Sequence, residues 1–198
     1  MAGAIFVTLA DQTARHKYFL RLHFREVVRG MSVDGKKAAA RDAARRVGLL
    51  AEFRRADTVG LFLSMGTEID TGPLIAAVWA AGKKVAVPVV FPDRNRMRFA
   101  LLSEGTGRMK KNVYGILEPV KPIWVDRLDL LIVPGSAFTG RGDRLGAGAG
   151  YYDRFLAAHP RVKSVGLCFD EQIAIWLPNA KHDRRVWAVA TPSGIYRP

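Results

Sequence analysis

The chain has 198 residues, of which 49% are hydrophobic and 25% charged, and its formal net charge is +13 at pH 7. This length and hydrophobic content suit one domain with a sizeable core. The single cysteine excludes a disulfide within the chain, and no run of about 18 uncharged apolar residues predicts a membrane-spanning helix. The first ten residues lack the basic start of a secretory signal, so a cytoplasmic protein is expected.

The positive charge has more than one interpretation. An excess of 31 Lys and Arg over 18 Asp and Glu is typical of proteins that bind nucleic acids. The basic residues are scattered singly or in pairs, however, and no zinc-finger spacing or aromatic RNA-binding signature accompanies them. A solvated basic surface, or one that attracts small polyanionic ligands, explains the same charge, and no nucleic-acid partner is expected.

Two helices are predicted before the first strand. Residues 11–29 have helix-like apolar spacing, and the basic residues at intervals of four share one helix face: Lys17, Arg21, Arg25 and Arg29. The second helix has Ser32 or Asp34 as its cap and extends to about residue 51. We interpret residues 11–52 as an N-terminal helical segment that precedes an α/β core at about 57–192.

The rest of the chain alternates between strand-like and helix-like segments. Helices are expected through residues 74–79 and from Tyr152, and strands at 58–63, 84–90, 97–102, 128–133, 163–169 and 186–191. The second and third of these strands follow each other across a short turn, which indicates an antiparallel pair in an otherwise alternating pattern. We therefore predict an α/β protein with one domain over residues 1–198 and a mixed, mostly parallel sheet.

A glycine-rich stretch at residues 134–156 connects a strand to a helix and reads PGSAFTGRGDRLGAGAGYYDRFL. Glycine permits positive φ angles and close backbone approach, so successive N–H groups ahead of a helix can form a concavity for phosphate. Arg144 adds a cation, and Asp153 adds a carboxylate that could hold a cation bound to those phosphates. Walker and dinucleotide-binding motifs do not fit, because Tyr151 follows Gly150.

This stretch resembles the signature of the 5-formyltetrahydrofolate cyclo-ligases, also called methenyltetrahydrofolate synthetases: P-G-x-A-F-D-x-x-G-x-R-L-G-x-G-x-G-Y-Y-D. The pattern departs at Thr139, where the family usually has aspartate. Family-like segments also occur at Lys17 (K-x-x-L-R), around Glu68 (G-x-E-x-D-T) and at Tyr114 (Y-G-I-L-E-P). The resemblance covers nearly the whole chain and implies a three-layer α/β/α fold.

The resemblance also implies a reaction: the ATP- and Mg-dependent cyclisation of 5-formyltetrahydrofolate to 5,10-methenyltetrahydrofolate, with release of ADP and phosphate. Phosphorylation of the formyl oxygen makes it a leaving group, so that the neighbouring N10 can attack the carbon. Catalysis of this type depends on positioning and on neutralising phosphate charge. The implied partners are ATP and 5-formyltetrahydrofolate, including its polyglutamylated forms, and a monomer or weak dimer is expected.

Roles for individual residues follow from the same resemblance. The catalytic residues would be Arg144, Tyr151 and Asp153, with Asp153 also the magnesium ligand. ATP would contact Lys17, Arg21, Arg144, Gly146, Gly148, Gly150 and Tyr152. Folate would contact Leu63, Glu68, Tyr114, Ala147 and Tyr151. Core packing remains an equal explanation for Tyr114, and solvation of a loop remains one for Glu68.

Departures near the C-terminus support two alternatives. The family pattern H-D-x-x-x-D-x-x-x-T-E has carboxylates where this chain has Trp187 and Pro192, and the first of them helps to hold magnesium. A metal ligand is thus expected to be missing, although water could replace it. A paralogue with lost or altered activity is therefore one alternative, and a basic nucleic-acid-associated protein is a remote second. His182 and Asp183 adjoin without a Ser or Cys nucleophile motif, which argues against a catalytic triad.

Overall fold

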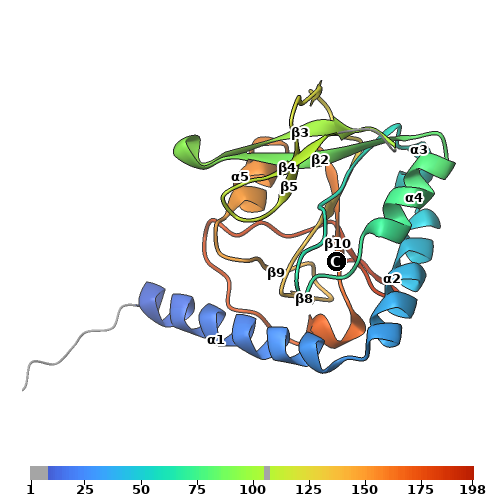
Figure 1. Ribbon diagram of the computed structural model, residues 1–198. Coiled ribbons are helices and arrows are strands. Elements are labelled where there is room, and N and C mark those ends of the chain that lie inside the picture. The colour runs from blue at the N-terminus through green and yellow to red at the C-terminus, as the bar shows by residue number, and fades with distance from the viewer. Residues whose placement is uncertain (1–8, 105–107) are drawn as a thin grey trace, which may run out of the picture.

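The computed structural model describes residues 9–104 and 108–198, and it has helices on both faces of an eight-stranded sheet (Figure 1). In sheet order the strands are β13 (Ile195–Tyr196), β12 (Ala188–Ala190), β10 (Lys163–Leu167), β7 (Leu130–Val133), β1 (Thr58–Gly60), β2 (Lys84–Phe91), β3 (Arg96–Leu102) and β6 (Trp124–Val125). The five strands from β12 to β2 pair in parallel, whereas β13, β3 and β6 are antiparallel to their neighbours. This confirms the predicted mixed, mostly parallel sheet.

The helices are α1 (Leu9–Gly30), α2 (Val33–Gly48), α3 (Ala51–Arg55), α4 (Gly72–Ala80) and α5 (Tyr151–Ala158). Ser32 caps α2, because its hydroxyl accepts a hydrogen bond from the Gly35 N–H at 3.1 Å. The prediction that the second helix extends to about residue 51 was wrong. The helix stops at Gly48, and Leu50 turns inward with an extended backbone before α3 begins.

Side chains of the central strands alternate between two cores, as expected for a sheet covered on both faces. On one face, Val59, Leu130 and Ile132 pack with the apolar side chains of α2 and α4. On the other face, Leu131 and Val133 pack in the cluster that includes Leu156 of α5. The protein therefore has three layers, and α1 runs along the lower edge of the molecule in Figure 1. Cys168, the single cysteine, is fully buried.

Several short elements were not predicted from the sequence. Within the glycine-rich stretch, β8 (Ala137–Thr139) and β9 (Arg144–Leu145) form a small sheet with β11 (Ile173–Ala174). The other additions include the edge strands β6 and β13, the hairpin of β4 (Met109–Lys111) and β5 (Leu117–Pro119), and the 3₁₀ turns η1 (Pro92–Arg94) and η2 (Asp170–Gln172). These segments are too short to show a periodic pattern. None of the helices in the described ranges has the length and apolar character that a membrane crossing requires.

Candidate active site

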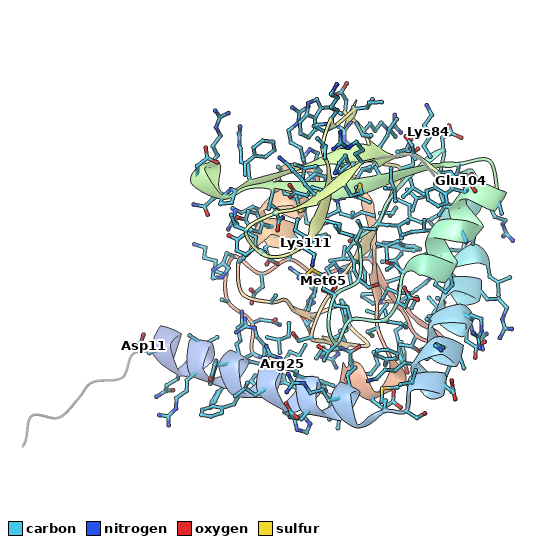
Figure 2. The ribbon with its side chains drawn as sticks, viewed as in Figure 1. Asp11, Arg25, Met65, Lys84, Glu104 and Lys111 are labelled. Carbon is cyan, nitrogen blue, oxygen red and sulfur yellow. The ribbon has the colours of Figure 1, made fainter. Side chains whose placement is uncertain are left out.

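A cleft of about 690 Å³ lies between α1, the loop after β1 and the part of the glycine-rich stretch that follows β9. Figure 2 shows Arg25 on α1 and Met65 in the loop after β1 on two sides of this space, and both line the cleft. The volume is within the range of typical small-molecule sites. Every site residue proposed from the sequence lines this one cleft: Lys17, Arg21, Leu63, Glu68, Tyr114, Arg144, Gly146, Ala147, Gly148, Gly150, Tyr151, Tyr152 and Asp153.

The loop at residues 146–150 forms one wall of the cleft. Gly148 and Gly150 have φ angles of +113° and +70°, a region that residues with a Cβ rarely adopt. The Arg21 side chain donates from Nε to the Gly146 carbonyl oxygen at 2.7 Å, which ties this loop to α1. Within the described part of the chain, the backbone N–H groups of residues 146–150 donate to no protein acceptor. The loop is therefore a cradle with free donors, ahead of the N-terminus of α5.

Arg144 is the most enclosed cation of the cleft, with a side chain only 4% exposed. Its Nη2 lies 2.8 Å from Oδ1 of Asp153, and its Nη1 donates to the Pro134 carbonyl oxygen at 3.4 Å. The Nε of Arg144 is buried without a hydrogen-bond partner among the described residues. Buried donors are almost always satisfied in native proteins. This orphaned N–H therefore fits a site that receives an anionic ligand.

The basic face of α1 points only partly into the cleft. Lys17, Arg21 and Arg25 line it, as their spacing of four residues predicts. Arg29 instead forms an exposed ion pair with Glu26 at 2.6 Å and is not part of the lining. The cationic wall therefore consists of the first three of the four residues.

Glu68 and two tyrosines, Tyr114 and Tyr151, also line the cleft. The Glu68 carboxylate accepts a hydrogen bond from the Met65 N–H at 2.8 Å. Burial raises the pKa of Glu68 to about 7, and the Met65 hydrogen bond only partly opposes that rise. The hydroxyls of Tyr114 and Tyr151 lie 3.1 Å apart, and their rings meet edge to face with centroids separated by 6.0 Å. These residues bring a carboxyl group of raised pKa and flat aromatic surface to the cleft lining.

A profile described as the 5-formyltetrahydrofolate cyclo-ligase family matches residues 13–192. The chain belongs to this family. It is 35% identical to the 5-formyltetrahydrofolate cyclo-ligase of Escherichia coli K12 over 176 residues, which cover 85% of this chain and 96% of the relative. The mouse 5-formyltetrahydrofolate cyclo-ligase is 28% identical over 84% of this chain and 89% of its own length.

A solved structure agrees with the sequence comparisons. The Aquifex aeolicus 5,10-methenyltetrahydrofolate synthetase superposes with a TM-score of 0.78 and 28% identity, covering 91% of this chain and 92% of that chain. The fold predicted from the resemblance is thereby confirmed. The roles of individual cleft residues stay predictions.

The departures from the cyclo-ligase pattern lie outside the cleft lining. Trp187 makes cation–π contacts with Lys163 and Arg197, at 5.2 and 5.1 Å from its ring centroid, and does not line the cleft. The Pro192 carbonyl oxygen accepts a hydrogen bond from Arg46 Nε at 3.3 Å, also outside the lining. The presence of Trp187 and Pro192 in place of the family's carboxylates therefore removes no carboxylate from the lining of the cleft in this structure.

Sequence reasoning missed the polar residues that support the cleft. Thr139 is buried and donates to Oδ2 of Asp143 at 2.9 Å, so a carboxylate is present beside position 139. Asp183 lines the cleft and pairs with Lys17. Glu118 has a structural role because it accepts hydrogen bonds from the Val90 N–H and from Asn112 Nδ2. The family motifs identify residues that line the cleft but carry no signal for these pairings.

Proposed function

We propose that this protein catalyses the ATP-dependent cyclisation of 5-formyltetrahydrofolate to 5,10-methenyltetrahydrofolate, with release of ADP and phosphate. One observation carries the proposal: the residues that the family motifs nominate for ATP and for folate all line a single cleft. Membership of the cyclo-ligase family and the 35% identity to the Escherichia coli enzyme of that name support the same activity.

The nucleotide is proposed to bind between α1 and the loop at residues 146–150. Lys17 and Arg21 bring positive charge from α1, and the loop offers free N–H donors to phosphate oxygens. The orphaned Nε of Arg144 is a further donor inside the cleft. Tyr152, whose pKa is raised well above its ordinary value by burial and by the Glu68 carboxylate, stays a neutral wall beside the guanidinium of Arg144.

Asp153 is the proposed magnesium-binding residue. Magnesium bound in nucleotide sites commonly uses one or two carboxylates together with waters and substrate phosphates, so a site with one such residue fits this donor set. When bound, the ion would neutralise phosphate charge. The Asp153 carboxylate is oriented for this role by Arg144 and by the N–H of Arg184, which donates to Oδ1 at 3.0 Å.

The folate is proposed to bind against Glu68, Leu63, Ala147 and the two tyrosines, Tyr114 and Tyr151. A carboxylate accepts hydrogen bonds from the N–H and amino groups that the reduced pterin presents. The rings of the tyrosines and the Leu63 side chain offer apolar surface to the flat parts of the substrate. The two substrates would then meet between the proposed folate contacts and the loop at residues 146–150.

The chemistry follows from that placement. The formyl oxygen attacks the γ-phosphorus and ADP leaves; N10 then attacks the activated carbon and gives up its proton to solvent, and phosphate departs with the former formyl oxygen. No covalent bond to the protein is required, so these side chains act by alignment and charge neutralisation. Arg144 is the residue proposed to stabilise the transferring phosphoryl group, because its guanidinium is fixed and desolvated before any ligand arrives.

The deciding experiment mixes the purified protein with 5-formyltetrahydrofolate and magnesium-ATP and follows the absorbance of methenyltetrahydrofolate. An ATP-dependent rise is expected, and the reaction without ATP is the control. No rise, together with folate or nucleotide binding in a calorimeter, would instead identify a paralogue with altered activity. Tight RNA or DNA binding that weakens steeply with salt would favour the nucleic-acid alternative. The cytoplasmic location and the monomer or weak dimer stay predictions, and light scattering tests the latter.

A further inference from the structure

The segment at residues 179–186, here called the strap, contributes His182 and Asp183 to the cleft lining and is anchored near both ends by Asp143. Oδ1 of Asp143 accepts hydrogen bonds from Asn179 Nδ2 at 2.9 Å and from Arg185 Nε at 2.6 Å, while Oδ2 accepts from the hydroxyl of Thr139. Burial opposes ionisation of Asp143, but these hydrogen bonds outweigh it, so the pKa of Asp143 lies below its ordinary value. The strap is therefore fixed to the β8–β9 turn.

The strap is also tied to the cleft itself. The Arg184 N–H donates to Asp153 at 3.0 Å, and the Val186 N–H donates to the Gly142 carbonyl oxygen at 2.9 Å. Gly142 has a φ of +80°, and a Cβ there would collide with the Val186 carbonyl oxygen, so this close approach requires glycine. These contacts leave the backbone on either side of Asp183 little freedom to move.

Asp183 is the strap residue that reaches a cation of the cleft. Its Oδ2 accepts hydrogen bonds from the Ala180 N–H at 2.6 Å and from the ammonium of Lys17. The Asp183 and Lys17 side chains are only 15% and 11% exposed, so water screens this ion pair weakly. Burial disfavours the Asp183 anion, yet the hydrogen bonds from Lys17 and Ala180 dominate, and its pKa is lowered. The carboxylate therefore stays ionised beside Lys17 at neutral pH.

We propose that Asp183 is a positioning residue for ATP: it fixes the ammonium of Lys17 at the wall of the cleft before the nucleotide binds. An unrestrained lysine side chain loses rotamer freedom when a ligand immobilises it, and a preformed ion pair removes much of that loss. Only one of the three ammonium donors is used by Asp183, so two remain for phosphate oxygens. The inference rests on the proposed function, because it assigns Lys17 to the nucleotide.

The Asp183 charge has two opposing effects on nucleotide binding, and a variant without that charge shows which one dominates, because one effect predicts tighter and the other weaker binding. If Asp183 only neutralises Lys17, removing its charge strengthens the attraction of the cleft for a polyanion. If Asp183 positions Lys17, removing its charge replaces the ion pair with a weaker neutral hydrogen bond, which loosens the lysine and weakens nucleotide binding. Asp183→Asn distinguishes the two, because asparagine keeps the shape and still accepts the Ala180 hydrogen bond.

The experiment measures KM for ATP and for 5-formyltetrahydrofolate with the full chain. Asp183→Asn is expected to raise the ATP KM about fivefold to tenfold and to leave the folate KM within about twofold. Asp42→Asn is the matched control, because Asp42 forms an exposed ion pair with Arg45 on α2, and neither KM should change. An ATP KM that is unchanged or lowered in Asp183→Asn overturns the proposal.

A double-mutant cycle tests whether the effect passes through Lys17. Lys17→Met should raise the ATP KM by itself, and adding Asp183→Asn should then have no further effect. Independent, multiplicative effects would show that Asp183 acts otherwise and overturn the inference. If Asp183→Asn does not fold, Asp183→Glu keeps the charge but displaces it by one methylene, and an unchanged ATP KM in that variant rejects the positioning role.

The double-mutant cycle can also be measured as ATP binding, without the cyclisation reaction. Should the wild-type protein fail to cyclise its substrate, calorimetric titration with magnesium-ATP gives the same comparison as dissociation constants. Weaker ATP binding in Asp183→Asn would then support the positioning role although the proposed reaction had failed. Unaltered ATP binding would reject it.

Discussion

Arg144 and Asp153 form a largely buried ion pair, with 2.8 Å between Nη2 and Oδ1 and side chains 4% and 15% exposed. The pair joins β9 to the first turn of α5 and so holds together the two ends of the glycine loop at residues 146–150. The residues proposed for phosphate and for magnesium are thus oriented by each other. Preorganisation of this kind spares the reorganisation that charge development would otherwise require.

Asp153→Asn tests two expected roles of the Arg144–Asp153 pair, one in stability and one in magnesium-dependent turnover. Loss of the carboxylate leaves the Arg144 guanidinium buried without its counter-charge, which is expected to lower the free energy of unfolding by about 3 kcal/mol. Magnesium-dependent turnover should fall by about a hundredfold or more at saturating ATP. Urea unfolding and a magnesium titration of the rate measure the two effects. Near-normal turnover in a folded variant would remove Asp153 from the metal site.

Gly148→Ala should impair the nucleotide site with little effect on the core. The φ of +113° is strained for alanine, and a Cβ at this position would lie 3.8 Å from Arg21 without a severe clash. We expect the ATP KM to rise about tenfold while the melting temperature falls by only a few degrees. Gly194→Ala is the matched control, since a Cβ there meets nothing within 4 Å and its φ is not positive. Equal ATP KM values in Gly148→Ala and Gly194→Ala would refute the proposal that the loop at residues 146–150 binds the nucleotide.

Much of the cleft was predictable because many of its lining residues belong to short contiguous motifs. The four-residue spacing of Lys17, Arg21 and Arg25 predicted a shared face, and the structure puts all three on the cleft. The pairing of Lys17 with Asp183 joins residues 166 positions apart. No local period encodes such a contact, since it depends on how the strap is carried back past α1.

Other differences have local causes. The helix break at Leu50 was missed because alanine- and arginine-rich sequence favours helix on both sides of it. The strands β8 and β9 were missed because residues 137–145 contain a turn with glycines at 140 and 142, which masks alternation. Trp187 was interpreted through an aligned family motif, but a motif position does not say which way its side chain points.

Glu68→Gln should change the pH dependence of stability. The folded-state pKa of about 7 is above the ordinary value of 4.5, so the native protein binds more protons than the unfolded chain between these values. Stability contributed by the protonated group is therefore lost as pH rises from about 4.5 through 7. Glutamine does not titrate, so the variant should gain about 2 to 3 kcal/mol relative to wild type between pH 5 and pH 8.

Urea unfolding at several pH values measures this gain, and Glu26→Gln, on the exposed ion pair with Arg29, should show none. The cyclisation rate should move the other way, because an amide presents a donor where the carboxylate offers only acceptors. A stability difference that is flat with pH would mean that Glu68 titrates normally. A more stable but less active Gln variant would mark Glu68 as a group retained for binding at a cost in stability.

Trp187→Asp restores the aspartate of the family pattern, and the structure predicts that it gains nothing. The side chain at 187 contacts Lys163 and Arg197 rather than the cleft, so the variant loses two cation–π contacts and partly buried apolar surface. We expect the free energy of unfolding to fall by about 2 kcal/mol, with kcat, the ATP KM and the magnesium requirement within about twofold of wild type. Trp187→Phe, which keeps an aromatic face, should lose less stability. A lower magnesium requirement in Trp187→Asp would instead show that position 187 reaches the metal when ligands are bound, and that the tryptophan has displaced a functional carboxylate.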